Sequence, residues 1–174
     1  MNNIQLFLFF SFIVIASHAQ ILPIELVNET IAKIDKADDL IENARKMARK
    51  ALSGKNINEA KLDCSLMIKL AEEAEKIAGL AEMKADEAEQ SYYKKACNNA
   101  ASKVDDSEDY CRHLGYYTHE MVIYSKKALN EKDNILFKSY LGKVLEYAAE
   151  CYESIKNAKI NFEDAVKEAE QCEN

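Results

Sequence analysis

Apolar residues recur every three or four positions along nearly all of the chain after residue 19, which is the spacing of one helical face. Short polar stretches divide this pattern into four segments. They predict helices from Pro23 to about Leu52, from Asn56 to about Cys97, from near Asp105 to Ser107 onward, and from Asp133 to near Cys172. The predicted buried stripes are Val27, Ile31, Ile34, Ala37, Ile41, Ala44, Ala48 and Ala51; Leu66, Leu70, Ala74, Ile77, Ala81, Ala85, Ala88 and Tyr92; Val104, Cys111, Leu114, Thr118, Met121 and Ala128; and Tyr140, Val144, Tyr147, Cys151, Ile155, Phe162 and Ala165.

Local signals mark the ends of the first two segments. Pro23 is tolerated in the first turn of a helix. Gly54 stands where a helix stop favours a residue that accepts positive φ. Asn56 and Glu59 have the spacing of a capping box, which predicts that the second helix starts there.

A nine-residue stretch occurs twice. Residues 48–56 recur 77 positions later as residues 125–133, with four identities, and each copy ends one stripe and begins the next. We interpret them as the turns of two tandem helical hairpins, residues 20–97 and 98–174, although any two amphipathic helices can be aligned. A second hairpin would cover the apolar face of the first. The sequence therefore predicts an all-α, up-down-up-down four-helix bundle of long, antiparallel, coiled-coil-like helices, forming one domain over residues 20–174.

The first 19 residues have the pattern of a secretory signal peptide. An apolar run from Leu6 to Ala16 is too short to span a bilayer, and Ser17 and Ala19 place small residues where a signal peptidase reads them. We expect cleavage before Gln20 and secretion to the extracellular space, with no membrane association afterwards. An uncleaved anchor is the alternative.

Composition narrows the classes of partner. The chain has 30 acidic and 23 basic residues and a net charge of −7, which disfavours nucleic acid and anionic membrane surfaces. One Pro and four Gly leave little material for turns or sheets. A monomer and a homodimer are both compatible with this composition.

All five cysteines lie in the part expected to be secreted, where disulfides are the default. Cys111 and Cys151 are equally distant from a turn near residue 131, and Cys97 and Cys172 end helices that point the same way. We therefore predict Cys111–Cys151 and Cys97–Cys172 bonds and a free Cys64. A Cys97–Cys111 bond competes if the turn between the hairpins lies near Val104.

Nine tyrosines all lie from Tyr92 onward. Tyr110, Tyr117 and Tyr124 repeat every seven residues, and across the turn Tyr124 should lie near the level of Tyr140 and Tyr117 near that of Tyr147. This predicts either an aromatic seam between helices or a partly polar groove for a small ligand. Off that stripe, His113, Tyr116 and His119 are predicted to be exposed and to form a contact patch.

The remaining motifs are few. The sequence shows no catalytic constellation, no spacing typical of metal ligands and no cofactor motif, so we expect no enzyme and no bound metal or cofactor. Asn28 begins a glycosylation sequon. The sequence favours a secreted helical binding protein for an extracellular protein partner. Two alternatives are a carrier of a small lipophilic ligand in a Tyr-lined bundle interior and a self-assembling structural coiled-coil component.

Overall fold

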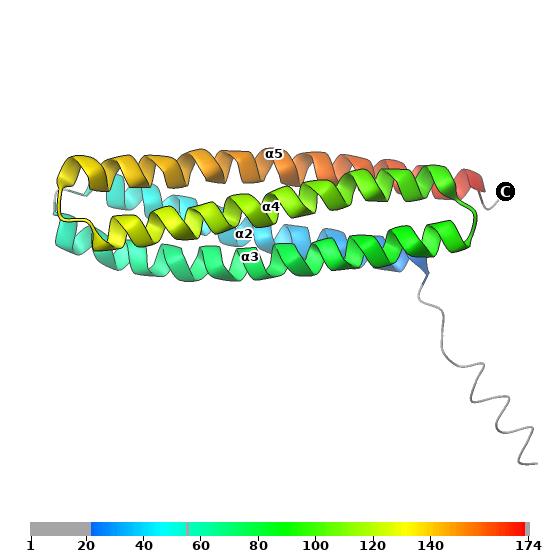
Figure 1. Cartoon of the computed structure of the whole chain (residues 1–174), viewed down its shortest axis with the longest axis horizontal. Helices are drawn as coiled ribbons and strands as arrows, with labels where there is room; N and C mark the ends of the chain where they lie inside the picture. The colour runs from blue at the N-terminus through cyan, green and yellow to red at the C-terminus, as the bar shows by residue number, and fades with distance from the viewer. Residues whose placement is uncertain (1–21, 55, 173–174) are drawn as a thin grey trace, which may run out of the picture.

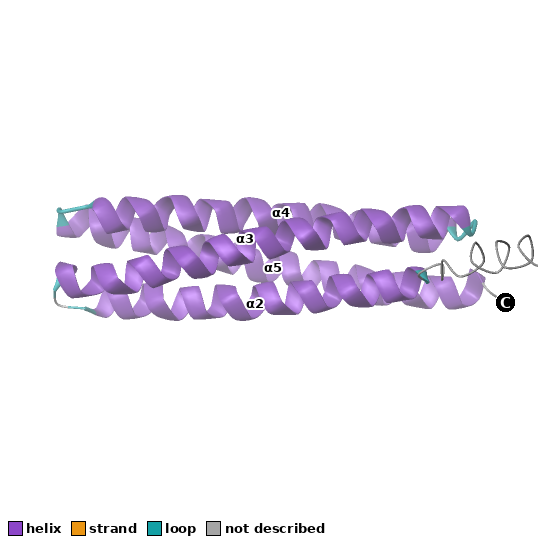
Figure 2. Ribbon diagram, turned by 90° about the horizontal axis from the view of Figure 1, so that it is seen from below, coloured by secondary structure: helices purple, strands orange, loops and turns teal. Residues whose placement is uncertain are grey.

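The computed structural model describes residues 22–54 and 56–172, and within them it contains four α-helices and no strand (Figures 1 and 2). The helices are α2 (Pro23–Ser53), α3 (Ile57–Lys94), α4 (Asn98–Asn130) and α5 (Asn134–Cys172). The predicted four-helix bundle is thereby confirmed. The proposed signal peptide lies outside the described residues.

The four helices run antiparallel and form a long rod (Figure 1). Helices of 31 to 39 residues are about 46–59 Å long at a rise of about 1.5 Å per residue. The α2–α3 and α4–α5 turns lie at one end, and the α3–α4 turn lies at the other end with the last turn of α5 (Figure 1). Each helix packs along its neighbours in sequence, and α5 closes the ring against α2.

Capping side chains begin two of the helices. The Asn56 side chain accepts a hydrogen bond from the backbone N–H of Asn58 at 2.9 Å. The Asp133 carboxylate accepts bonds from the N–H groups of Ile135 and Leu136 at 2.8 and 2.9 Å. Both residues therefore begin the helices as the sequence predicts, because each satisfies backbone donors that have no partner within the helix.

Alanine fills much of the interface between helices, and a few larger side chains fill the centre. The largest buried side chains include Phe137 and Phe162 of α5, Ile34 and Ile41 of α2, and Met67 of α3. The α3 stripe differs at its start from the prediction, because Leu66 is 47% exposed and Leu70 is only partly buried. The true face runs through Ala60, Cys64, Met67, Ala71 and Ala74.

The α3–α4 turn departs most from the sequence analysis. Helix α3 ends at Lys94 and α4 begins at Asn98, well before the predicted start near Asp105. The reason is a hydrogen-bonded stop at the end of α3, in which Ala96 adopts φ 60°. The acidic residues near Asp105 that signalled a start instead lie inside α4, because Ala100, Ala101 and Val104 around them are buried in the core.

The α2–α3 turn also differs in detail. Gly54 has φ −64°, so the expectation that it supplies a left-handed residue is wrong. Its backbone N–H bonds the carbonyls of Lys50 and Ala51 at 3.1 and 3.3 Å. A Cβ at this position would lie 3.2 Å from the Ala51 carbonyl oxygen. Glycine is therefore favoured here because the backbone passes close to that carbonyl, and not because the turn needs a positive φ.

No helix in the described ranges is long and apolar enough to cross a membrane.

Candidate contact surface on the second hairpin

A line of tyrosine rings follows the boundary between α4 and α5. The centroids of Tyr117 and Tyr147 are 6.3 Å apart, Tyr147 stacks on Tyr124 at 5.7 Å, and Tyr124 lies 6.2 Å from Tyr140. These pairs confirm which tyrosines are neighbours across the turn. Offset or edge-to-face contacts at such distances are favourable between aromatic rings, so the line is a continuous contact between the two helices.

The tyrosines lie at the outer edge of this boundary. Tyr110, Tyr117, Tyr124, Tyr140 and Tyr147 are all partly buried and pack against the core from outside. The interior beneath them is filled by fully buried side chains that include Leu114, Met121, Phe137, Leu141 and Phe162. The rings therefore lie at the surface of the bundle, outside its packed interior.

Two of the three predicted patch residues extend this line onto the exposed face. His113 lies 6.3 Å from both Tyr110 and Tyr117, and Tyr116 meets the Tyr117 ring edge-on at 5.4 Å. His113 is exposed, and Tyr116 is 56% exposed. We call Tyr110, His113, Tyr116, Tyr117, Tyr124, Tyr140 and Tyr147 the aromatic strip.

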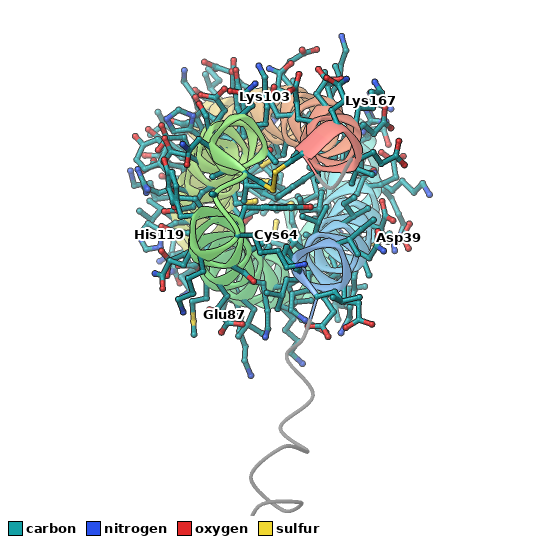
Figure 3. The ribbon with its side chains drawn as sticks, turned by 90° about the vertical axis from the view of Figure 1, so that its right-hand side faces the viewer. Asp39, Cys64, Glu87, Lys103, His119 and Lys167 are labelled. Carbon is teal, nitrogen blue, oxygen red and sulfur yellow. A yellow bond between two sulfur atoms is a disulfide. The ribbon has the colours of Figure 1, made fainter. Side chains whose placement is uncertain are left out.

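His119, the third predicted patch residue, is exposed but lies outside the aromatic strip. Its Nδ1 lies 2.9 Å from Oε1 of Glu75 on α3. Figure 3 shows it at the outer side of the bundle where α3 and α4 adjoin. It therefore contributes to the α3–α4 boundary, and no ring contact joins it to the aromatic strip within the described residues.

Charged side chains border the strip. The Lys127 ammonium lies 4.3 Å from the centroid of the Tyr124 ring, a cation–π contact. Lys143 and Glu146 form an ion pair at 2.7 Å on the α5 side. Partial burial, together with the nearby Glu120 carboxylate, raises the pKa of Tyr147. The strip is thus an apolar centre with a polar rim, the arrangement found at protein interfaces.

The outer surface of the first hairpin is mostly paired charge, for example Lys36 with Glu73 at 3.3 Å. It also exposes four apolar side chains of α3 that sequence reasoning missed or placed in the core: Leu62, Leu66, Leu80 and Met83. They form two separate pairs, because 14 residues, or about 21 Å of helix, separate Leu66 from Leu80. The aromatic strip is the more continuous surface.

One disulfide of the predicted set is present. Cys97 and Cys172 are bonded, with Cα atoms 5.7 Å apart, which ties the end of α5 to the α3–α4 turn (Figure 3). This bond was predicted because both residues end helices that point the same way. It also excludes the competing Cys97–Cys111 pairing.

The predicted Cys111–Cys151 bond is wrong, and both thiols are free and buried. The reason is register. The Ser107 hydroxyl of α4 donates to the Ala158 carbonyl of α5 at 3.2 Å, and the Tyr147 ring lies between those of Tyr117 and Tyr124. The hydrogen bond shifts Cys111 toward the level of Ser154, about three residues or about 4.5 Å along the axis from Cys151, and the contact of Cys151 with Met121 shows a shift in the same direction. A disulfide requires its two Cα atoms to face each other within about 7 Å.

The three free thiols are unreactive in character. Cys64 is free, as predicted, and burial raises its pKa to about 11. Burial also raises the pKa of Cys111 to about 12 and that of Cys151 well above the usual range. The Cys151 sulfur contacts the Met121 sulfur at 3.9 Å. Since only a thiolate attacks or binds metal, these side chains act as core residues.

Two further surface features bear on chemistry. Asp86, Glu89 and Glu108 bring carboxylate oxygens within 4.8 Å of one another at the α3–α4 boundary, which sequence reasoning missed because acidic pairs at helical spacing are abundant. Burial raises the pKa of Glu89, with added repulsion from Asp105 and Glu108. This cluster is partly exposed and offers carboxylates alone, so we assign no metal to it.

The glycosylation sequon lies within α2. Asn28 is exposed, so the fold has room for a glycan at that position. Thr30 is fully buried, and its hydroxyl donates to the Leu26 carbonyl at 2.8 Å. A glycosylating enzyme that must contact the threonine hydroxyl of the sequon can therefore do so only before α2 packs into the bundle.

Comparisons with protein-family models, with curated proteins and with solved structures found no match.

Proposed function

We propose that the protein is a secreted, non-enzymatic binding protein that engages an extracellular protein partner through the aromatic strip. The observation that carries the proposal is the continuous series of ring contacts from Tyr110 to Tyr140 on one outer face, with Tyr116 standing 56% exposed. Secretion rests on the signal-like pattern of residues 1–19.

Three physical arguments support an interface at the strip. Tyrosine rings give a large contact area at low cost in side-chain entropy and are enriched among the residues that dominate binding energy. The strip residues are already ordered by ring contacts, so a partner would not bear the cost of ordering them. The strip lies on two rigid helices of a bundle, a placement that positions side chains more reproducibly than loops.

The test is capture of a partner from the extracellular fluid of the source, followed by affinity measurement with purified proteins. Tyr116→Ala should weaken binding about tenfold or more, the loss typical of a central aromatic contact. Tyr93→Ala is the matched control, because Tyr93 is a tyrosine of similar exposure (51%) at the end of α3. It should leave the affinity unchanged.

Two outcomes would contradict the assignment. Equal affinity of the Tyr116→Ala and Tyr93→Ala proteins would remove the strip from the interface. If charge reversal at Glu72 of α3 abolishes binding while the Tyr116→Ala protein still binds the partner, the interface lies on the first hairpin. Light scattering of the mature protein separates binding to a partner from self-assembly. If the strip joined copies of this chain, Tyr116→Ala would lower the molar mass measured in solution.

A further inference from the structure

The boundary between α2 and α5 is built differently from the other three sides of the bundle. These two helices contact each other much less extensively than the other adjacent pairs. Long polar side chains bridge the space. Lys159 of α5 pairs with Asp35 of α2 at 2.5 Å, and the Tyr152 hydroxyl donates a hydrogen bond to the Glu42 carboxylate. Long polar side chains therefore span the fourth side of the bundle, where the two helices contact each other least.

An open cleft of about 400 Å³ lies on this boundary, lined by Asp38, Asp39, Glu42, Arg45 and Tyr152. Asp39 points outward from α2, on the side of the bundle opposite His119 (Figure 3). The cleft is thus separate from the α3–α4 boundary and from the aromatic strip. Its volume falls within the range of sites that hold small organic molecules.

The cleft already holds a planar cation, which is the chain's own guanidinium. The ζ carbon of Arg45 lies 4.9 Å from the centroid of the Tyr152 ring. The Arg45 Nη2 bonds the Glu42 carboxylate at 2.7 Å. The ring face and the carboxylate therefore form a two-sided cradle, in which the cation gains from the quadrupole of the ring and from the opposite charge.

Arg45 fits this cradle imperfectly. Its Nε is buried and has no hydrogen-bond partner, and an unsatisfied buried donor carries a desolvation cost. Arg45 is otherwise about a quarter exposed, so its side chain has solvent to turn into. If the guanidinium left the cradle, water would satisfy its Nε.

The charges of the cleft are not balanced by Arg45 alone. Asp38, Asp39 and Glu42 supply three carboxylates, which face the Arg45 guanidinium and the exposed Lys46 ammonium, 3.9 Å from Glu42. Asp38 and Asp39 form no ion pair within 4 Å in the described part of the chain; Lys159 pairs with Asp35 and attracts Asp38 from a greater distance. Asp38 is half-buried. A second cation would therefore be attracted to this cleft.

We propose that the α2–α5 cleft binds a small planar organic cation, an amidinium or guanidinium, which stacks on Tyr152, pairs with Glu42 and displaces Arg45. Asp38 and Asp39 supply the additional negative charge that favours a cation over a neutral molecule of the same shape. Arg45 is then an internal competitor, because the site is open only in the fraction of molecules whose Arg45 has turned away. This site is independent of the aromatic strip and of the function proposed for it.

The probe is benzamidine, with benzamide as the neutral molecule of matching shape, and binding is measured by isothermal titration calorimetry on the mature protein. Benzamidine should bind and benzamide should not. Arg45→Met should strengthen benzamidine binding about three- to tenfold, since the competitor is gone. Arg49→Met is the matched control. It makes the same change of charge one turn along α2 at an exposed position, and it should change the affinity by less than twofold.

A complementary variant tests the cradle itself. Glu42→Gln keeps the shape of the side chain but removes its charge, and it should weaken benzamidine binding about tenfold. Tyr152→Leu removes the ring on which benzamidine would stack and should weaken binding by a similar factor. Circular dichroism checks that each variant stays helical. Equal binding of benzamide, no binding of benzamidine to either the unchanged protein or Arg45→Met, or equal effects of Arg45→Met and Arg49→Met would each overturn the proposal. The benzamide comparison needs no variant, so it stands even where a variant fails to fold.

Discussion

The end of α3 offers a sharp test of the backbone. Ala96 has φ 60°, and it is the one non-glycine residue with positive φ among those described. The N–H of Cys97 bonds the Tyr92 carbonyl at 3.1 Å, and the N–H of Ala96 bonds the Tyr93 carbonyl at 3.0 Å. These two bonds are the Schellman stop, whose left-handed position usually holds glycine because a Cβ there is crowded.

The change Ala96→Gly should therefore stabilise the protein. A left-handed conformation costs an ordinary residue about 1–2 kcal/mol, and glycine avoids this cost. Glycine also has more conformational freedom in the unfolded chain, which lowers the free energy of unfolding by about 0.4–1 kcal/mol and offsets part of this gain. The net increase in the free energy of unfolding is about 0.5–1 kcal/mol. For a domain of this size that raises the melting temperature by about 1–4 °C.

The assay is thermal and urea unfolding followed by circular dichroism, with the disulfide intact. Ala149→Gly is the matched control, because Ala149 is an exposed alanine inside α5. That change should lower stability by about 1 kcal/mol, since glycine disfavours a helix interior. Ala96→Val should also lower stability, because a β-branched side chain is strongly disfavoured at positive φ. If Ala96→Gly destabilises as much as Ala149→Gly does, Ala96 is not left-handed and the stop described here is wrong.

Three further predictions concern the bundle as a whole. Replacing Cys97 and Cys172 by serine should cost about 4 kcal/mol in urea unfolding, because their bond closes a loop with a sequence separation of 75; an unchanged midpoint would contradict this. The three free thiols should resist a thiol reagent in the native protein at neutral pH and all react in urea, because burial raises their pKa values; rapid native labelling would show that the core opens. The hydrogen bond from Tyr152 lowers the pKa of Glu42 below its ordinary value near 4.5, so this contribution to stability is present above that pH and lost as pH falls through the lowered pKa. Tyr152→Phe should therefore flatten the pH dependence of unfolding below about pH 4.5, and an unchanged slope would remove Glu42 from the acid response.

The sequence by itself determined the helices, their order and two of their three turns. Helical spacing of apolar residues and capping by Asn56 and Asp133 are local properties, which depend on residues within one or two turns. Short turns then oblige neighbouring helices to run antiparallel. That is why Tyr117 could be predicted to lie near Tyr147, and Tyr124 near Tyr140, by counting from the turn.

Other features were decided only in the tertiary structure, because they depend on small shifts or on distant residues. No glycine marks the α3–α4 turn, so local signals placed the next helix too late, whereas packing of Ala100, Ala101 and Val104 extends α4 back to Asn98. A shift of about three residues between α4 and α5 moves side chains by about 4.5 Å, which is enough to separate the short Cys111 and Cys151 side chains, whereas the long tyrosine side chains still reach each other.

The α2–α5 cleft was beyond sequence reasoning altogether. Glu42 and Tyr152 are 110 residues apart, and neither stands in a motif. Each looks like one more surface position on an amphipathic helix. They meet because the first and last helices become neighbours when the bundle closes, and only the spacing of those two helices decides whether alanines pack there or polar side chains reach across.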